Sequence, residues 1–429
     1  MRRSRLLDSD DLAIKAAYLK GECKISQNDI ARKLSLGQPT VSRLLRRAVE
    51  ELHCLESVER FVRIPQIDDR KMAELERLLE YADLADTLKA LPTATGLRLR
   101  GLRVFDSGST DRSPVGLDTR QRAFGQAVAP HLAERLRQAR HVGVAWGSTL
   151  SRVIDGLARL GFPWQSDPEP RVFVPVTAEP MQYARSEHTA SVLARRLHVL
   201  VNGEDERLPP LLSLTGVPAF IPYDPTDLVP GARRLPRKQR DLLSRGLREF
   251  FVSNSPAYRT IFTEPDGLIG RLDTLLTAAG PSRRVMGFCN DDLLKSGHLD
   301  RDKLEQLVVG DLGGVLLTRP APSRTAQPTV DRLRSMWTGI SRAQLEAIAR
   351  RAAEKGSGTP GVILMTFGEN RTEVVAEALA QGLCTELFID DELAQCLRQE
   401  FARRVSNAGQ SQRPASPRGP EASARRAAP

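Results

Sequence analysis

Short, strongly apolar runs alternate with helical patterns from about residue 100 to the end of the chain. The runs read as buried strands: LRVFD (102–106), HVGVAW (141–146), RVFVPV (171–176), RRVMGFC (283–289), GGVLLT (313–318), GVILMTF (361–367) and TELFID (385–390). Helical spacing of apolar residues is found over 118–138, 148–160, 186–197, 341–354 and 371–382. Such alternation is typical of a mostly parallel sheet covered by helices, so the sequence predicts a Rossmann-like α/β domain.

The first 60 residues have a different pattern, which indicates a compact helical block. Within SQNDIARKL, Ser26 and Asp29 are spaced as a short version of a helix-capping pair. A short turn follows, and QPTVSRLLRRAVEEL begins with Gly37 as an acceptable N-cap and Pro39 in the first turn. Two short helices joined by such a turn predict a helix-turn-helix domain.

The second helix of this motif has an apolar side and a polar, basic side. Val41, Leu44, Leu45 and Ala48 have the spacing of a buried stripe, and the stretch 32–47 contains no acidic residue. Glutamine can bond adenine and arginine can bond guanine, while further cations suit phosphates. The predicted DNA-binding residues are Gln38, Thr40, Ser42, Arg43, Arg46 and Arg47. The alternative is the solvated face of an ordinary surface helix.

Composition fits a multidomain protein with a polyanionic partner. The chain has 429 residues and a net charge of +10, which favours nucleic acid. Five cysteines are far apart and six histidines are scattered, so no metal site is expected, and the thiols indicate a reducing compartment. Neither a signal peptide nor a long apolar run is present, so a cytoplasmic protein without membrane contact is expected.

The composition and pattern changes divide the chain into four parts. The expected parts are a helix-turn-helix domain (1–60), a linker or oligomerisation helix (61–94), an α/β domain (95–404, with 203–250 partly an insertion) and a disordered tail (405–429). The second part contains the long amphipathic stretch DRKMAELERLLEYADLADTLKAL. The tail lacks the apolar residues that folding requires.

Two polar turns follow predicted strands and precede predicted helices. Gly147, Ser148 and Thr149 offer backbone N–H groups and hydroxyls at a helix N-terminus, which suits an anion. In the second turn, Arg371 could bind a phosphate and Glu369 could accept hydrogen bonds from sugar hydroxyls. Loops at the carboxyl ends of parallel strands converge on a common crevice. The alternatives are an ordinary strand–helix turn and a surface ion pair.

Several segments, in this order, resemble the SorC family of bacterial sugar-responsive transcriptional regulators. The segments are SQNDIARKLSLGQPTVSRLLRRA, GQAVAPHLAERL with HVGVAWGSTLSRVI, VMGFCNDDLLKSGHLDRDKLEQLVVGDLGGVLL, TGISRAQLEAIAR and GVILMTFGENRTEVVAEALAQGLCTELFIDDELAQCL. The resemblance covers most of residues 10–400, with gaps near 92–120 and 203–250.

This resemblance implies an effector domain with the fold of sugar-phosphate isomerases, used as a ligand sensor. It also implies a homo-oligomer, a dimer or tetramer, that binds operator DNA under the control of a sugar or sugar phosphate. No cofactor is expected. The residues that would bind the effector are Gly147, Ser148 and Thr149 for phosphate, Asp311 at the rim, and Glu369 and Arg371, the last in place of the usual lysine.

The sequence departs from the family pattern at a few positions. After RVFVPV the family usually has glycines, whereas this chain has TAEP, in which Glu179 would repel a phosphate. Gly37 replaces a common serine cap, and the glycine that often follows the third helix is absent near Leu52. The wing or linker after that helix is therefore expected to differ.

Two other classes of protein are compatible with the sequence. One is a sugar-phosphate isomerase or lactonase on the same fold, which needs an acid and a base over the reacting carbons. The candidate carboxylates are Asp311, Glu369, Asp390 and Asp391, but they form no evident pair. The other is a DNA-binding protein whose C-terminal domain only oligomerises. We therefore expect a regulator without catalytic residues.

Overall fold

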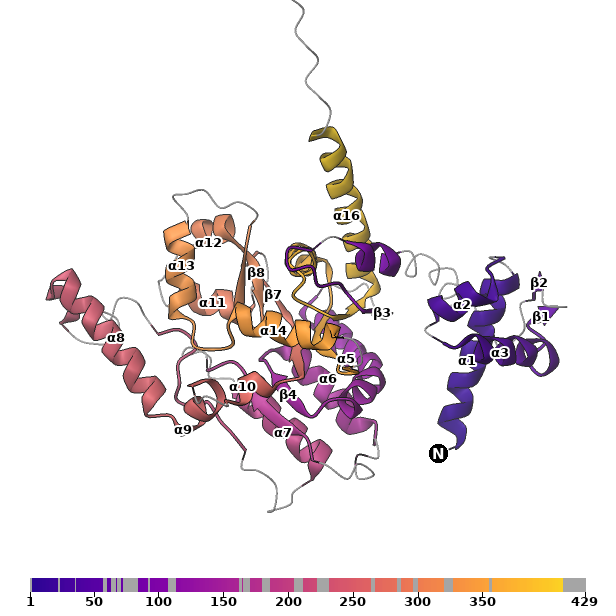
Figure 1. Ribbon diagram of the computed structural model, residues 1–429, viewed down its shortest axis with the longest axis horizontal. Helices are drawn as coiled ribbons and strands as arrows, with labels where there is room; N and C mark the ends of the chain where they lie inside the picture. Colours follow the sequence, from indigo (N-terminus) through magenta and orange to yellow (C-terminus); the bar gives the residue numbers. More distant parts are fainter. Residues whose placement is uncertain are drawn as a thin grey trace, which may run out of the picture. The chain divides into compact units, whose positions relative to one another are not determined.

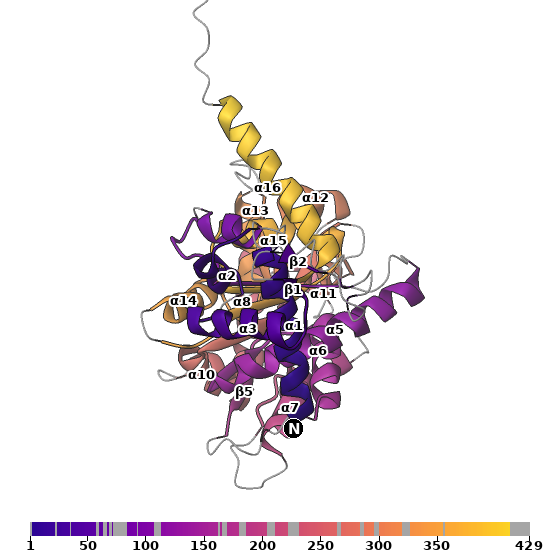
Figure 2. The same ribbon diagram turned by 90° about the vertical axis from the view of Figure 1, so that its right-hand side faces the viewer.

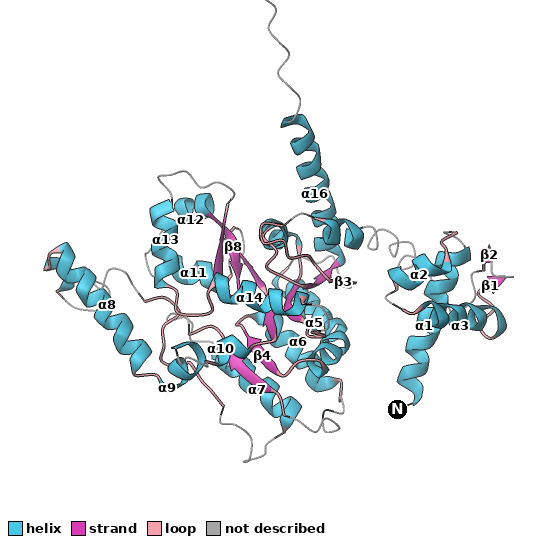
Figure 3. Ribbon diagram, in the orientation of Figure 1, coloured by secondary structure: helices cyan, strands magenta, loops and turns pink. Residues whose placement is uncertain are grey.

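The computed structural model consists of two compact units, 1–88 and 89–429, which we describe separately (Figure 1). It describes residues 2–21, 24–34, 36–56, 60–62, 67, 71, 84–91, 93–106, 113–161, 164, 170–179, 186–203, 211–221, 231–263, 267–283, 287–295, 300–319, 327–354 and 357–411. The first unit is mainly helical, and the second combines strands and helices (Figure 3).

The first unit contains the predicted helix-turn-helix. Its elements are α1 (Arg2–Gly21), α2 (Gln27–Lys33), α3 (Gln38–Glu50), β1 (Leu55–Glu56) and β2 (Arg60–Phe61). The hydroxyl of Ser26 accepts a hydrogen bond from the N–H of Asp29 at 3.2 Å, and Gly37 is the N-cap of α3. Both predicted helix starts are thus confirmed. After α3, β1 and β2 pair antiparallel as a short two-stranded wing.

A small apolar core holds these helices together. Ile30 from α2 and the predicted stripe of α3 are all buried, together with residues of α1. Ile67 belongs to the same core, and the ammonium of Lys71 pairs with Asp11. The first unit therefore extends beyond the predicted boundary at residue 60. Most of the predicted oligomerisation helix lies outside the described residues, apart from a helical stretch over 84–90.

The second unit is built on a six-stranded sheet. Its strands are β3 (Gly101–Phe105), β4 (His141–Val144), β5 (Val172–Pro175), β6 (Thr274–Thr277), β10 (Gly361–Thr366) and β11 (Glu386–Asp390). They lie in the order β3-β11-β10-β6-β4-β5, and every neighbouring pair is parallel. The predicted α/β class with a mostly parallel sheet is therefore confirmed.

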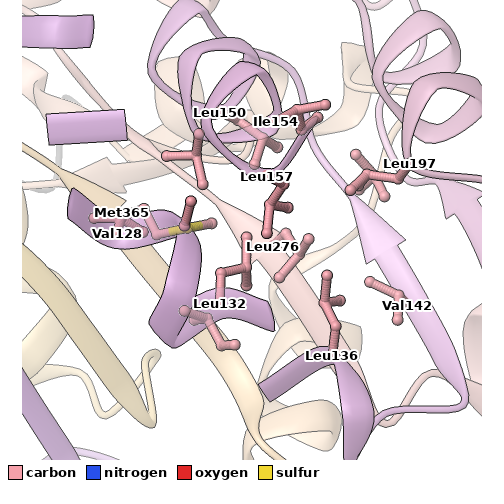
Figure 4. Close-up of a cluster of buried hydrophobic side chains, with 14 of the residues drawn as sticks. Val128, Leu132, Leu136, Val142, Leu150, Ile154, Leu157, Leu197, Leu276 and Met365 are labelled. Atoms are coloured by element: carbon pink, nitrogen blue, oxygen red, sulfur yellow. The ribbon is translucent and has the colours of Figure 1, made fainter. Parts of the chain in front are cut away.

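Helices cover both faces of this sheet (Figures 1 and 2). The helices around it are α5 (Pro114–Arg137), α6 (Ser148–Arg159), α7 (Ala190–Asn202), α10 (Leu268–Arg271), α14 (Arg342–Ala353), α15 (Thr372–Ala380) and α16 (Asp391–Ser411). On one face α5, α6 and α7 share a core with the strands, and Figure 4 shows Leu132, Leu157 and Leu276 within it. On the other face α14 packs against β6 and β10. These layers leave the carboxyl ends of the strands at one edge of the sheet.

Two glycines allow α5 and α6 to pack closely. A Cβ atom on Gly125 would lie 2.4 Å from the carbonyl oxygen of Arg152, and one on Gly156 would lie 2.5 Å from that of Gly125. Because the obstructing atoms belong to the backbone, the helices would have to separate to admit a methyl group.

Gly156→Ala is therefore expected to destabilise the second unit by about 1–2 kcal/mol, after the gain in helix propensity is subtracted. Urea unfolding followed by tryptophan fluorescence measures this unit, since Trp146, Trp164 and Trp337 all belong to it. Gly246→Ala is the matched control, because a Cβ atom there meets nothing within 4 Å. It should stabilise slightly, and equal effects of the two substitutions would contradict the packing argument.

The prediction that RRVMGFC forms a strand is wrong for those of its residues that the structure describes. Phe288 begins α11 (Phe288–Lys295), and 284–286 lie outside the described residues. A second, antiparallel sheet instead contains β7 (Ala279–Pro281), β8 (Val308–Leu312) and β9 (Val315–Thr318). The last of these starts later than predicted because Gly313 and Gly314, with φ of 57° and 85°, form the hairpin turn.

The second unit contains further helices, some of which contact this small sheet. They are α8 (Arg237–Ser253), α9 (Pro256–Tyr258), a π-helix (Arg259–Thr263), α12 (Arg301–Leu307), α13 (Gln327–Met336) and the 3-10 helices Ser186–His188, Ala232–Arg234 and Glu369–Arg371. Part of the predicted insertion 203–250 is thus the long helix α8. Helix α16 continues to Ser411 and projects beyond the sheet, so the predicted tail cannot begin at residue 405 (Figures 1 and 2). The remainder of that tail, 412–429, lies outside the described residues.

Over the described residues, no helix is long and apolar enough to cross a membrane. The same residues contain no group of three or more potential metal ligands. Four cysteines are described, and all are free thiols: Cys54, Cys289, Cys384 and Cys396.

Candidate functional site

Helix α3 turns its polar side chains to solvent. Gln38, Arg43 and Arg46 are exposed, and Thr40 and Ser42 are half-buried. These residues lie opposite the buried stripe formed by residues such as Val41 and Leu45, because α3 is strongly amphipathic. The amide of Gln38 donates to Gln27 Oε1 at 3.2 Å, and Arg43 Nη2 donates to Thr40 Oγ1 at 3.4 Å. Such exposed contacts can exchange for contacts with DNA.

The sixth predicted DNA-binding residue has a different environment. Arg47 Nη2 lies 2.6 Å from Asp10 Oδ1, and Arg47 Nε lies 3.2 Å from Glu51 Oε2. Only 22% of its side chain is exposed. Arg47 therefore ties α3 to α1, and its charge is already met by two carboxylates.

A topological switch point lies between β4 and β6 in the second unit. From β4 the chain runs through α6 to β5 on one side, whereas β6 is followed in the sheet by β10 and β11 on the other. Ligands of open parallel sheets bind at the carboxyl ends of the strands beside such a point. The turn at Gly147 lies here, since a Cβ atom on that residue would be 3.9 Å from the Cβ of Ala278, just after β6.

The turn after β4 places a helix N-terminus at this edge of the sheet. Gly147, with φ of 134°, is the N-cap of α6 and provides no capping side chain. The first N–H groups of the helix, from Ser148 onward, therefore have no capping partner from that residue. Thr149 is buried, and Ser148 Oγ accepts a hydrogen bond from Gln121 Nε2 of α5 at 2.8 Å. The arrangement suits an anion near Ser148.

The turn after β10 is held by buried charges. Asp390 Oδ1 accepts hydrogen bonds from the N–H groups of Gly368 and Leu393, both at 3.0 Å. Its other oxygen lies 3.1 Å from Arg120 Nη2, which also pairs with Glu392. Burial raises the pKa of Asp390, whereas these N–H groups and Arg120 act in the opposite direction. Arg120 and Gln121, neighbours on α5, thus fix the two turns.

Arg371 lies in the second turn, where only part of its guanidinium group is hydrogen-bonded among the described residues. Its Nη1 donates to the carbonyl of Phe367 at 2.7 Å and to Asn370 Oδ1 at 2.8 Å, and the guanidinium lies 5.0 Å from the centre of the Phe367 ring. Its Nε is buried without a partner among the described residues. Burial lowers the pKa of Arg371 to about 10, so it remains charged near neutral pH. Glu369, also in this turn, is half-buried.

Asp311 lies in the antiparallel sheet rather than in either turn. Its Oδ2 accepts from the N–H of Gly314 at 2.8 Å, and its Oδ1 accepts from Asn290 Nδ2 at 3.3 Å. Burial raises the pKa of Asp311 to about 7, although the Gly314 N–H acts against this. The carboxyl group therefore fixes the β8–β9 hairpin.

Strand β7 brings the predicted residues together. It follows Ala278 directly, pairs with Asp311 through Gly280, and contacts the 3-10 helix Glu369–Arg371. The hairpin reaches the same edge, because a Cβ atom on Gly313 would lie 2.9 Å from Thr277 Oγ1. The structure thus gathers all six predicted effector residues around the ends of β4, β6 and β10.

Further buried polar atoms line this edge. The hydroxyl oxygens of Thr177, after β5, and Thr366, at the end of β10, are buried without a partner among the described residues. Buried hydroxyls normally have partners, so these two could serve a ligand or water. Glu179 accepts a hydrogen bond from the Thr215 hydroxyl at 3.2 Å, and its repulsion of a phosphate stays a prediction.

A cavity of about 500 Å³ lies beside this edge. It is lined by residues of α8, the segment 258–263, β9, and the chain from Arg334 to Gln344. None of the six predicted effector residues lines it. The β8–β9 hairpin touches both the cavity and the edge, since Gly314 belongs to the cavity wall and Gly313 packs against Thr277 at the edge of the sheet.

Sequence reasoning missed Arg120, Gln121, Thr177 and Thr366. The two threonines end or follow predicted strands, so the rule that located Ser148 also applies to them. The two α5 residues carry no such signal, because a polar pair on an amphipathic helix reads as solvent-exposed.

Solved structures of transcriptional regulators resemble this chain at low identity. The full-length sorbitol operon regulator SorC of Klebsiella pneumoniae is 19% identical, with 90% of this chain and 97% of that chain covered and a TM-score of 0.49. A probable sor operon regulator of Shigella flexneri is 17% identical, with 74% and 99% covered and a TM-score of 0.47. A domain of a possible sugar-binding transcriptional regulator of Arthrobacter aurescens is 20% identical, with 73% and 96% covered and a TM-score of 0.44. No protein-family model and no curated protein matches the chain.

Proposed function

We propose that this chain is a DNA-binding transcriptional regulator of carbohydrate metabolism, whose operator binding is modulated by a sugar or sugar phosphate in the second unit. The observation that carries the proposal is the exposed face of α3, where Gln38, Arg43 and Arg46 lie opposite a fully buried stripe. A recognition helix requires this division, since its N-terminal residues meet base edges while cations meet phosphates.

The crevice of the second unit is the proposed effector site. A phosphate would bind the N–H groups at the start of α6 with the Thr149 hydroxyl, and the charge of Arg371 would approach from the other turn. Sugar hydroxyls would bond with Gln121 and Glu369. Asp311 would not contact the effector directly. It would hold the β8–β9 hairpin beside the site.

The arrangement of carboxylates favours a sensor over an isomerase. Asp311 and Asp390 both accept hydrogen bonds from backbone N–H groups, and Asp390 is paired with Arg120 as well. Asp390, which is bound by two N–H groups and an arginine, is poorly placed to exchange a proton with a substrate. We also propose a cytoplasmic homo-oligomer, because two copies of α3 can read a two-fold operator.

Selection of duplexes from a random DNA library would provide the binding sequence. Its affinity, measured by fluorescence anisotropy with and without a panel of sugars and sugar phosphates, tests the proposal. We expect sequence-specific binding that one class of sugar changes by about 5–150-fold. Failure to select any sequence would refute the DNA-binding role, and turnover of a sugar phosphate would favour the enzyme.

Thr149→Val is expected to weaken the effector response at least about tenfold, because a hydrogen bond to a charged group contributes roughly 1.5–3 kcal/mol. DNA affinity without effector should be unchanged. Thr119→Val, on the exposed side of α5, is the matched control and should respond like the wild type. An unaltered response in Thr149→Val would exclude this turn from the effector site.

A further inference from the structure

We propose that the cavity of about 500 Å³ beside the crevice is a second ligand site, which binds a small planar organic anion such as an aromatic carboxylate. Its size is typical of small-molecule pockets. It is distinct from the proposed effector site, because its walls contain neither Ser148 and Thr149 nor Arg371.

Three aromatic side chains form the apolar part of the cavity. Tyr258 and Phe262 lie with ring centres 4.7 Å apart and are tilted by 37°. Trp337 is held by its Nε1–H, which donates to the carbonyl of Ile340 at 2.8 Å. Gly314 and Gly339 pack against the indole, where any Cβ atom would come within 2.5 Å of it. These fixed rings suit a flat ligand, since aromatic groups prefer offset or edge-to-face contacts.

The polar part of the cavity is cationic. Three arginines line it, and none of its lining residues is acidic. Arg342 pairs with Glu346 at 2.7 Å, and Arg334 lies 3.8 Å from Asp331. Arg248 instead donates to the carbonyls of Ser335 and Trp337, at 2.9 and 3.3 Å, and has no carboxylate partner among the described residues. The net positive charge selects an anion rather than a neutral or cationic aromatic molecule.

The cavity is joined to the crevice by one aromatic contact. Trp337 lies 5.5 Å from Trp146, ring centre to ring centre, at 70°. Trp146 immediately precedes the turn at Gly147, which begins the proposed phosphate site. An occupant held against Trp337 is therefore connected to the effector turn through two packed indole rings, those of Trp337 and Trp146, and would be in a position to alter the affinity of that turn.

Calorimetric titration of the full chain with naphthalene carboxylate tests the site directly, without reference to DNA or sugar. We expect saturable binding that Phe262→Ala and Arg334→Gln each weaken about tenfold, or by about 1.4 kcal/mol. Phe250→Ala and Arg332→Gln are the matched controls, because both residues are exposed and neither lines the cavity. They should bind as the wild type does, as should Thr149→Val.

Three results would overturn the proposal. Equal binding of naphthalene carboxamide would refute the preference for an anion. Unchanged affinity in both cavity variants, or loss of binding in Thr149→Val, would move the ligand out of this cavity. Absence of saturable binding would remove the site altogether. None of these outcomes bears on the role of α3 or on the sugar response, so the proposed function stands or fails separately.

Discussion

Arg120→Leu is expected to destabilise the second unit by about 3–5 kcal/mol, the usual effect of removing one partner of a buried ion pair. Only 6% of the Arg120 side chain is exposed, and the Asp390 side chain is not exposed at all. Without the guanidinium, the carboxylate of Asp390 would keep the two N–H groups but lose its ion pair with Arg120. Urea unfolding followed by tryptophan fluorescence measures the loss.

The loss should depend on pH. Burial already raises the pKa of Asp390 above the unfolded value of about 3.9, and removal of Arg120 should raise it further. Above the pKa of Asp390 in the folded variant, the buried carboxylate is charged and the variant shows its full loss of stability. As the pH falls below that pKa, Asp390 binds a proton and the loss disappears. We expect a smaller deficit at about pH 5 than at about pH 7.5.

Arg122→Leu provides the matched control for this prediction. Arg122 lies on the same helix and pairs with Asp118 at 2.7 Å, but 54% of its side chain is exposed. Solvent weakens such pairs, so the change should cost at most about 1 kcal/mol. Similar losses in both variants, or a deficit at Arg120 that does not vary with pH, would mean that Asp390 is not the group left uncompensated.

The sequence was sufficient to predict the helix-turn-helix of the first unit and five of the six strands of the main sheet. In α3 the period of Val41, Leu44, Leu45 and Ala48 leaves one buried side, and the cap at Ser26 fixes where α2 begins. Strands such as β10 and β11 are buried along their whole length because helices cover both of their faces, and the apolar runs within them make them easy to locate.

The parts that were missed depend on contacts between residues distant in the sequence. Strand β6 is short and was not predicted. It leads into β7, which is a strand only because its Gly280 pairs with Asp311 of β8, a residue distant in the sequence. The start of β9 was predicted too early, because the turn at Gly313 and Gly314 depends on a contact with the distant Trp337, whose indole leaves no room for a Cβ atom on Gly314. The same holds for the site: the turns at Ser148 and Arg371 follow from local pattern, whereas their support by Arg120 and Gln121 spans more than 20 residues of sequence.

Arg43→Ala is expected to abolish discrimination at one base position in each half-site, with a loss of about 1–3 kcal/mol for each contact. Folding should be preserved, because the side chain is exposed and its contact within the unit is a 3.4 Å hydrogen bond to Thr40. Anisotropy titrations of the selected duplex and of duplexes substituted at single positions measure the effect, at fixed salt concentration.

Arg46→Ala separates base reading from phosphate binding. Arg46 is exposed on the same face but one turn further along α3, away from the N-terminal end that meets base edges. Its removal should weaken all duplexes about equally and lower the slope of affinity against salt by about one. Arg122→Ala, in the second unit, should change neither quantity. If Arg43→Ala retained the full preference for the selected sequence, α3 would not be the recognition helix, and its exposed arginines would be an ordinary solvated face.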